Sequence, residues 1–374
     1  MKRNTHSHTH SISLMGFILF FLLFIAAQGY VAWRVWQIMP APVAVKIAAM
    51  VLMVALIALF FFAMTPQLDK LPMPVATAAY EVSTSYVIVL LYLLLLFVCM
   101  ELGRLVHLFP REFMHGSVEG TLIVTIAVVA LLVYGNLHYR HKYCERLQLL
   151  TEKPMRETVR MVMVSDLHLG YHNNRQELAR WVDSINAQKP DIVLIAGDIV
   201  DRSVKPLLDE DMAAELRRVK APIFACPGNH EYYSGYAACD SFYHDAGIRL
   251  LRDETAVWGG MLIVGRDDRT NAARKPLAEL IGRNEKRYVI VLDHQPYHLE
   301  EAEQAGVDFQ LSGHTHHGQV WPISWVTELI YECAWGLHSR GETQYYVSSG
   351  LGIWGGKFRI GTRSEFVVAE LWSR

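Results

Sequence analysis

The sequence lacks a cysteine framework. Its five cysteines form no Cys-x-x-Cys pair and have no regular spacing, which argues against a thiolate zinc site. It also lacks an excess of charge of either sign, because 35 Lys and Arg residues oppose 37 Asp and Glu residues, a formal net charge of −2. This balance gives no reason to expect a nucleic-acid partner. We find no internal repeat and no low-complexity tract.

Long hydrophobic runs, in contrast, are plentiful and unevenly placed. Hydrophobic residues make up 52% of the chain, and four apolar stretches crowd into its first third, at about residues 12–33, 47–64, 83–100 and 120–137. Each approaches the roughly 20 residues needed to cross a bilayer core. We therefore predict four transmembrane helices in a multi-pass membrane region over residues 1–137. The alternatives are buried core helices or a cleaved signal peptide at 12–33, but that stretch is long for a signal and lacks a clear cleavage site before Gly29.

Four spans would place both termini on one side of the membrane. Positive residues near the span ends are more frequent on that side. Those on the side of the termini are Lys2, Arg3, Lys70, Arg140, Lys142 and Arg146, and those on the other side are Arg34, Lys46, Arg104 and Arg111. Cytoplasmic loops carry an excess of Lys and Arg, so this bias predicts a cytoplasmic C-terminal region.

The second half of the chain predicts a soluble domain. Residues 138–158 are polar and basic, which indicates a linker, and the domain then covers residues 159–374. It opens with a β-rich run at 159–165, an amphipathic helix at about 174–187 and an apolar run at 191–196. Strand-like runs with helices between them early on, followed by strands alone, predict an α/β fold.

Side chains that bind metals directly follow five of the apolar runs. The candidates are Asp166 and His168 in SDLH, Asp198 in GD, Asn229 in GNHE, His294 in DH, and His314 and His316 in GHTHH. Chemistry in α/β sheets collects at strand ends, and residues i and i+2 of an extended chain face the same way. Each motif alone is also compatible with ordinary turn chemistry. Five in one order predict a common metal site.

Seven donors are too many for one zinc ion and suit two metals that share a bridging carboxylate. Oxygen and nitrogen donors without thiolates favour Mn, Fe or Zn. Two such ions activate water and hold both oxygens of an in-line phosphoryl displacement. We therefore expect two divalent metal cofactors and a hydrolase for a phosphorylated substrate.

The ordered set DLH, GDIVD, GNHE, DHQP and GHTHHGQ resembles the calcineurin-like metallophosphoesterase superfamily over about residues 160–372. Within it, SDLHLG and YYVSSGLG are similar to the bacterial membrane-associated branch of the YkuE and YaeI type. The resemblance implies two facing mixed β-sheets flanked by helices, in a protein of the bacterial inner membrane. It also implies these roles: Asp166, His168 and His316 hold one metal, Asp198 bridges, Asn229, His294 and His314 hold the other metal, and His230 protonates the leaving oxygen.

The sequence departs from the family pattern at His317, where members usually carry glycine. His317 is either an exposed residue without a role, or a substrate contact or additional titrating group at the mouth of the site. Its presence suggests a backbone that does not require glycine there. Arg202, after GDIVD, is either a phosphate ligand, as in related protein phosphatases, or a solvated loop residue. Asp201 and Glu231 are expected to orient the ligands.

The substrate is less visible in the sequence. Large apolar residues lie near the predicted site, at Trp321, Trp325, Ile330, Trp335 and Trp354. They are either core residues or the mouth for an amphipathic substrate that enters from the membrane interface. Relatives of this branch that cleave the pyrophosphate of UDP-diacylglucosamine imply a lipid-linked substrate. The alternatives are a general phosphodiesterase or phosphatase for soluble substrates, and a non-catalytic membrane scaffold, against which the complete donor set argues.

Overall fold

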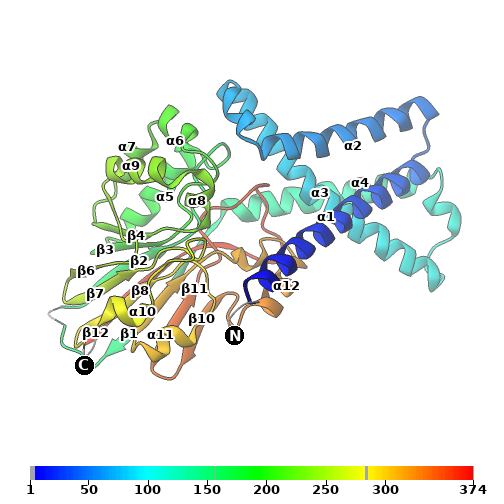
Figure 1. Cartoon of the computed structure of the whole chain (residues 1–374). Helices are drawn as coiled ribbons and strands as arrows, with labels where there is room; N and C mark the ends of the chain where they lie inside the picture. Colours follow the sequence, from blue (N-terminus) through cyan, green and yellow to red (C-terminus); the bar gives the residue numbers. More distant parts are fainter. Residues whose placement is uncertain (1–4, 156, 283–284, 374) are drawn as a thin grey trace. The chain divides into compact units, whose positions relative to one another are not determined.

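A computed structural model describes residues 5–155, 157–282 and 285–373, with side chains from residue 21 onward. The chain divides into two compact units. The first contains residues up to 68 and residues 82–133, and the second contains residues 69–81 and 134–374. Figure 1 shows that the first unit is helical and that the second combines helices with β-strands.

The first unit contains the long apolar helices. Its elements are α1 (Thr5–Ile38), α2 (Val43–Ala63), most of α3 (Met73–Leu105), η2 (Arg111–Met114) and most of α4 (Val118–Arg140). Among the described residues, α2, α3 and α4 are long and apolar enough to cross a membrane. The predicted spans at 47–64, 83–100 and 120–137 fall on these helices. The predicted first span, at 12–33, falls on α1 and extends into residues whose side chains lie outside the described part.

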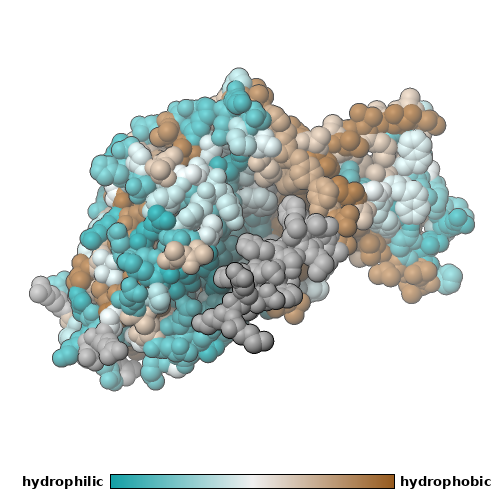
Figure 2. Space-filling view, viewed as in Figure 1, coloured by the Kyte–Doolittle hydropathy of each residue, from teal (hydrophilic) through white to brown (hydrophobic). Residues whose placement is uncertain are grey.

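The surfaces of these helices are apolar. Val51, Leu52 and Val54 of α2 are each about 60% exposed or more, at 63%, 59% and 66%. Figure 2 shows brown, hydrophobic surface over the helical unit, whereas the visible face of the second unit is largely teal. Such a surface suits contact with lipid, because a helix in water buries its apolar face.

The second unit is built on two six-stranded mixed β-sheets. The strand order of the first sheet is β1 (Lys142–Thr151), β12 (Ser364–Ser373), β2 (Val159–Val164), β3 (Ile192–Ala196), β4 (Ile223–Cys226) and β5 (Ile248–Leu250). The order of the second is β10 (Gly336–Arg340), β11 (Thr343–Val347), β9 (Phe309–Ser312), β8 (Tyr288–Leu292), β7 (Met261–Gly265) and β6 (Glu254–Trp258). Strands β2 to β5 run parallel, as do β7, β8, β9 and β11.

Helices complete the second unit (Figure 1). They are η1 (Pro66–Lys70, in part), α5 (Arg175–Ala187), α6 (Lys205–Asp209), α7 (Met212–Leu216), α8 (Asn229–Ser234), α9 (Tyr236–Ala246), α10 (Leu277–Ile281), α11 (Glu300–Gln304), η3 (His316–Gly318) and α12 (Ile323–Ile330). Side chains alternate across β2: Val162 and Val164 pack with α5, α7 and α9, while Met161 and Met163 pack with the second sheet. A third cluster joins the outer face of the second sheet to α10 and α11. The predicted α/β fold with two facing mixed sheets and flanking helices is confirmed.

One strand lies where the sequence indicated a linker. Strand β1 occupies ten residues of the stretch 138–158 and pairs in parallel with β12 over its whole length. Leu147, Leu149 and Thr151 turn inward, and Arg146, Gln148 and Leu150 turn outward. Apolar and polar residues alternate along this stretch, which is typical of a strand with one buried face. Its basic residues made this alternation difficult to recognise in the sequence.

Candidate metal centre

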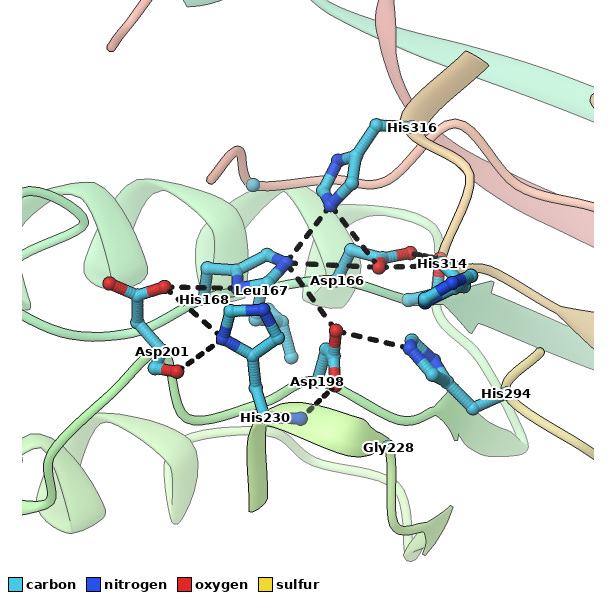
Figure 3. Close-up of polar contacts among 12 residues, drawn as sticks. Asp166, Leu167, His168, Asp198, Asp201, Gly228, His230, His294, His314 and His316 are labelled. Carbon is cyan, nitrogen blue, oxygen red and sulfur yellow. Dashed lines mark hydrogen bonds and ion pairs between the residues drawn. The ribbon is translucent and has the colours of Figure 1, made fainter. Parts of the chain in front are cut away.

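The predicted donors follow the carboxyl ends of β2, β3, β4, β8 and β9, in loops or, for Asn229 and His316, at the first residue of α8 and η3. These segments carry, in chain order, Asp166, His168, Asp198, Asn229, His294, His314 and His316. Strands β2, β3 and β4 run parallel in the first sheet, as β8 and β9 do in the second. The two sheets share a core, so the segments after these strands meet at one edge. Figure 3 shows the labelled donors pointing toward one another.

One group of donors consists of Asp166, His168 and His316, whose ligand atoms all lie within 4.8 Å of one another. His316 Nε2 is 3.0 Å from His168 Nε2 and 3.4 Å from Asp166 Oδ1. Imidazole nitrogens and a carboxylate oxygen that converge in this way form a set that could hold one divalent cation.

A second group consists of Asp198, His294 and His314, with ligand atoms again within 4.8 Å. Asp198 Oδ2 lies 3.0 Å from His294 Nε2 and 3.7 Å from His168 Nε2. One carboxylate oxygen thus faces a nitrogen of each group, which is the place of a ligand shared by two metals. His294 Nδ1 lies 2.8 Å from the carbonyl oxygen of Ala196, which leaves Nε2 for a metal.

Asn229 adds an oxygen donor beside Asp198. Its side chain is buried, and its Oδ1 has no hydrogen-bond partner among the described residues. A buried carbonyl without a partner is costly, and a bound cation would satisfy it. The residues present therefore fit two metal ions.

The backbone at the donors is unusual. Five donors have a left-handed backbone, with φ of 53° at Asp166, 44° at His168, 53° at Asp198, 70° at His314 and 48° at His316. Such conformations are uncommon outside glycine and cluster at functional sites. Two glycines permit the close approach of the loops: a Cβ on Gly228 would lie 2.1 Å from Asp198 Oδ1, and one on Gly313 would lie 2.2 Å from Asp166 Oδ2.

The buried groups set each other's charge. Burial alone would raise the pKa of Asp198, but the charges of His294 and His230 hold it well below the usual value. Burial alone would lower the pKa of His168, but the nearby carboxylates of Asp166, at 3.8 Å, and Asp201, at 3.2 Å, raise it to about 10. In the metal-free site His168 is therefore the doubly protonated imidazolium. A metal that binds one ring nitrogen would displace the proton on it.

His314 behaves differently from His168. Burial and the charge of His294 lower the pKa of His314 to about 4. Its imidazole is neutral at physiological pH, which is the form that binds a metal.

Two buried carboxylates support the donor loops, as the sequence indicated. Asp201 Oδ1 lies 3.2 Å from His168 Nδ1, so the other nitrogen of His168 faces the donors. Glu231 accepts hydrogen bonds from the backbone N–H groups of Gly228, Asp198 and Ile199 at 2.6, 3.2 and 2.8 Å. It thereby joins the loop after β3 to the loop after β4.

His230 lies at the edge of the donor set. Its backbone N–H donates to Asp198 Oδ1 at 2.9 Å, its Nδ1 contacts the carbonyl oxygen of Asp201, and its ring centroid is 4.6 Å from that of His168. Its side chain is 16% exposed, whereas that of His168 is 1% exposed. With Nδ1 held by the protein, Nε2 is the nitrogen available to a substrate.

The two predicted substrate contacts, Arg202 and His317, are both held by other side chains. Arg202 Nη1 lies 3.3 Å from Asp69 Oδ1, and only 14% of the Arg202 side chain is exposed, so it is not a solvated loop residue. His317 stacks on Trp335 with ring centroids 5.0 Å apart, and its Nε2 is 3.0 Å from Glu328 Oε1. With 16% of its side chain exposed, His317 is more covered than the alternative of an exposed residue predicts.

His317 also corrects an expectation about the backbone. Its φ of 49° lies in the left-handed region, which favours glycine. The loop thus keeps a conformation suited to the family's glycine, and the histidine adopts it at a cost of about 1 kcal/mol.

The large apolar residues after the site divide into two sets. Trp321, Trp325, Ile330 and Trp354 are 41%, 58%, 57% and 39% exposed. Trp335, by contrast, packs on His317 and donates a hydrogen bond to Glu365 Oε1 at 2.9 Å. Four of the five are surface residues, so a core role does not account for them.

Sequence reasoning missed two residues that form hydrogen bonds with the donor His316 or with Asp201, which contacts the donor His168. Arg359, which is fully buried, donates to the backbone carbonyl oxygen of His316 at 2.7 Å, and Tyr80 donates to Asp201 Oδ2 at 2.7 Å. Neither belongs to a metal motif. The one available signal was an arginine in the apolar, glycine-rich stretch GGKFRIG.

Comparisons with known proteins agree with this site. A family model described as calcineurin-like phosphoesterase matches residues 159–318, which include all seven donors. A metallophosphoesterase from Aquifex aeolicus is 32% identical over 257 residues, which cover 65% of this chain and 97% of the relative. A transmembrane protein with a metallophosphoesterase domain from Danio rerio is 31% identical over 312 residues, 74% of this chain and 69% of the relative. A metallophosphoesterase from Helicobacter pylori is 33% identical over 222 residues, 57% of this chain, and the chain spans 60% of that relative's length.

These matches, together with the fold and the donor set, define the class. The chain belongs to the calcineurin-like metallophosphoesterase family.

Proposed function

We propose that this protein is a membrane-anchored, dinuclear metal-dependent phosphohydrolase. The observation that carries the proposal is the position of Asp198 Oδ2 between His294 Nε2 and His168 Nε2, at 3.0 and 3.7 Å. In the proposal, Asp166, His168 and His316 hold one metal, Asp198 bridges, and Asn229, His294 and His314 hold the second. When bound, a pair of divalent cations supplies Lewis-acid activation of water and of a phosphoryl group.

The protein's own residues supply the remaining parts of the reaction. His230 donates a proton from Nε2 to the leaving oxygen, while the carbonyl oxygen of Asp201 holds its Nδ1. Asp201 and Glu231 keep the donor loops in place. Arg202 follows Asp201 in the chain. If its guanidinium leaves Asp69, it can bind a phosphate oxygen of the substrate.

The test is hydrolysis of bis-p-nitrophenyl phosphate and of p-nitrophenyl phosphate by the purified, detergent-solubilised chain with Mn²⁺. We expect the wild type to cleave at least one ester and Asp198→Asn to lose activity by about a hundredfold or more. Asp245→Asn, at an exposed carboxylate, is the matched control and should retain full activity. Equal rates for wild type and Asp198→Asn, or two inert proteins without bound metal, would refute the proposal. The ratio of the two rates reports the preference for diester or monoester.

We further propose that the substrate is lipid-linked, such as UDP-diacylglucosamine, whose pyrophosphate bond would be cleaved. Support comes from the exposed apolar face of α12, the helix that follows η3 and its donor His316. This face consists of Ile323, Trp325, Val326, Leu329 and Ile330, which are between 38% and 87% exposed. An apolar surface next to a phosphoryl site suits a substrate with acyl chains and a charged head.

A comparison of substrates tests this second step. The full chain is given UDP-diacylglucosamine in mixed micelles and, separately, soluble nucleotide diphosphates and diesters. We expect kcat/KM for the lipid-linked pyrophosphate to exceed that for the soluble compounds. Higher kcat/KM for soluble diesters would favour a general phosphodiesterase and would reject the lipid-linked substrate.

We also propose a location in the bacterial inner membrane with the catalytic unit in the cytoplasm. The charge bias at the predicted span ends supports this orientation. The three helices long and apolar enough to cross a membrane support the membrane location. A phosphatase reporter fused after Arg374 should be silent, and a fluorescent cytoplasmic reporter at the same place should be active. The opposite pattern would place the site outside the cytoplasm.

A further inference from the structure

Between the predicted spans at 47–64 and 83–100, the chain includes a segment that is part of the phosphoesterase unit and contains the first turns of α3. Residues 69–81 belong to the second unit together with residues 134–374. Three residues of this interspan segment, which we define as Asp69–Glu81, bind that unit through side chains. Asp69 Oδ1 accepts from Tyr171 OH at 2.7 Å and lies 3.3 Å from Arg202 Nη1, and Glu81 lies 3.2 Å from Lys357 Nζ.

The third of these residues is Tyr80, whose side chain is buried in the second unit. Its side chain is 1% exposed, and its hydroxyl donates to Asp201 Oδ2 at 2.7 Å. Its ring centroid lies 5.1 Å from that of His172 and 6.3 Å from that of Tyr171. A buried tyrosine hydroxyl needs a partner, and here the partner is a carboxylate of the metal site's support.

Asp201 uses its two carboxylate oxygens for different tasks. Oδ2 accepts from Tyr80, while Oδ1 lies 3.2 Å from His168 Nδ1 and 3.5 Å from His230 Nδ1. The terminal torsion of an aspartate is broad, so a carboxylate with one unbound oxygen rotates readily. A hydrogen bond to Oδ2 therefore fixes the direction in which Oδ1 faces the two histidines.

We propose that Tyr80 is a positioning residue of the hydrolytic site and acts through Asp201 on His168 and His230. The interspan segment is then a working part of the enzyme, and the membrane region does more than anchor it. The inference rests on the proposed phosphohydrolase function. It differs from simple packing, because packing by the tyrosine ring does not require the hydroxyl.

The variant Tyr80→Phe removes the hydroxyl and keeps the ring. It is compared, in the full detergent-solubilised chain, with Tyr345→Phe, which removes another buried hydroxyl that donates to the carbonyl oxygen of Leu299 at 2.7 Å. For Tyr80→Phe we expect kcat for bis-p-nitrophenyl phosphate to fall about tenfold with KM unchanged, which is the usual loss for a group that orients a metal ligand. Tyr345→Phe should show kcat and KM of the wild type.

Two further measurements separate positioning from loss of folding and from failure of the enzyme proposal. Calorimetric titration of the metal-free proteins with Mn²⁺ alone should show about tenfold weaker binding at one site for Tyr80→Phe. This readout stands even if the wild type cleaves none of the esters, in which case only the proposed function fails. Asp201→Ala and the double variant Tyr80→Phe/Asp201→Ala complete a cycle, and the double variant should be no less active than Asp201→Ala.

Three results would overturn the inference. One is Tyr80→Phe with the kcat and Mn²⁺ affinity of Tyr345→Phe. Another is a full additional loss from Tyr80→Phe in the Asp201→Ala background. The third is an equal fall in the thermal midpoint and in kcat for both tyrosine variants, which would reduce Tyr80 to a packing role.

Discussion

The guanidinium of Arg359 donates a hydrogen bond of 2.7 Å to the backbone carbonyl oxygen of His316. It also donates to the carbonyl oxygens of Ser349 and Gly352, at 2.5 and 3.3 Å, and to Ser364 Oγ at 3.1 Å. Burial lowers the pKa of Arg359 to about 10, with the charges of Glu365 and Asp166 acting against it, so the group stays charged at neutral pH. One buried arginine thus connects, through hydrogen bonds, the backbone at the candidate donor His316 to the segments before β12.

Replacing this arginine should loosen the His316 loop. Arg359→Met keeps the apolar stem but removes charged hydrogen bonds to buried carbonyl oxygens, at about 1–3 kcal/mol each. We expect a fall of about 2–4 kcal/mol in the free energy of unfolding and weaker Mn²⁺ binding at one site. Denaturant titration and calorimetry measure the two effects. Arg217→Met, at an exposed arginine that contacts the carbonyl oxygen of Asp245, is the control and should change neither quantity; the same loss in both variants would contradict the role given to Arg359.

Loss of His230 should depend on the leaving group. His230→Gln removes the proton donor while the seven metal donors remain, so metal content should stay at the wild-type level. We expect kcat to fall about a hundredfold or more with phenyl phosphate esters, whose leaving oxygen needs a proton, and far less with p-nitrophenyl esters. His244→Gln, at a side chain that is 91% exposed, should leave both rates unchanged. An equal fall for both leaving groups would assign His230 a role other than general acid.

The candidate metal donors could be predicted from the sequence because each belongs to a short polar motif directly after an apolar strand. The residues that form the site are therefore recognisable from their immediate neighbours in the chain. The structure brings Asp166, His168, Asp198, His294, His314 and His316 together as that pattern predicts. Tyr80 and Arg359 were not predictable, because their roles come from contacts across 121 and 43 residues of chain. Strand β1 was missed for a related reason: its partner β12 lies at the other end of the unit, and charged residues obscure its alternation.

The apolar face of α12 should matter for a lipid-linked substrate alone. Leu329 is 87% exposed, so Leu329→Gln should not affect folding. We expect KM for UDP-diacylglucosamine in micelles to rise about three- to tenfold, the equivalent of losing part of a leucine side chain's burial. Kinetics on bis-p-nitrophenyl phosphate should not change. Leu208→Gln, at a residue of α6 that is 60% exposed, is the control. If the two variants change the kinetics with the lipid-linked substrate equally, α12 does not bind this substrate.

Acid should destabilise the protein through His172. This buried histidine lies 4.0 Å from Asp201 and contacts the carbonyl oxygen of Ile353 at 2.7 Å. Burial lowers its pKa to about 4, although the charge of Asp201 and the contact with Ile353 act in the opposite direction. In the unfolded chain the pKa of histidine is about 6.5. Between these values the unfolded chain binds a proton that the folded protein does not, so stability falls as the pH falls from about 6.5 toward 4.

The size of this effect can be isolated with His172→Gln, which keeps an N–H donor for Ile353 and does not titrate. From pH 7 to pH 5 the His172 contribution amounts to about 2 kcal/mol. The wild type should therefore lose about that much more of its free energy of unfolding over this range than His172→Gln does, as measured by denaturant titration of the metal-free chain in detergent. His244→Gln, at an exposed histidine, should follow the wild type at both pH values. If His172→Gln loses as much stability as the wild type, the acid sensitivity resides in other groups, because a buried neutral histidine is the one feature that this variant removes.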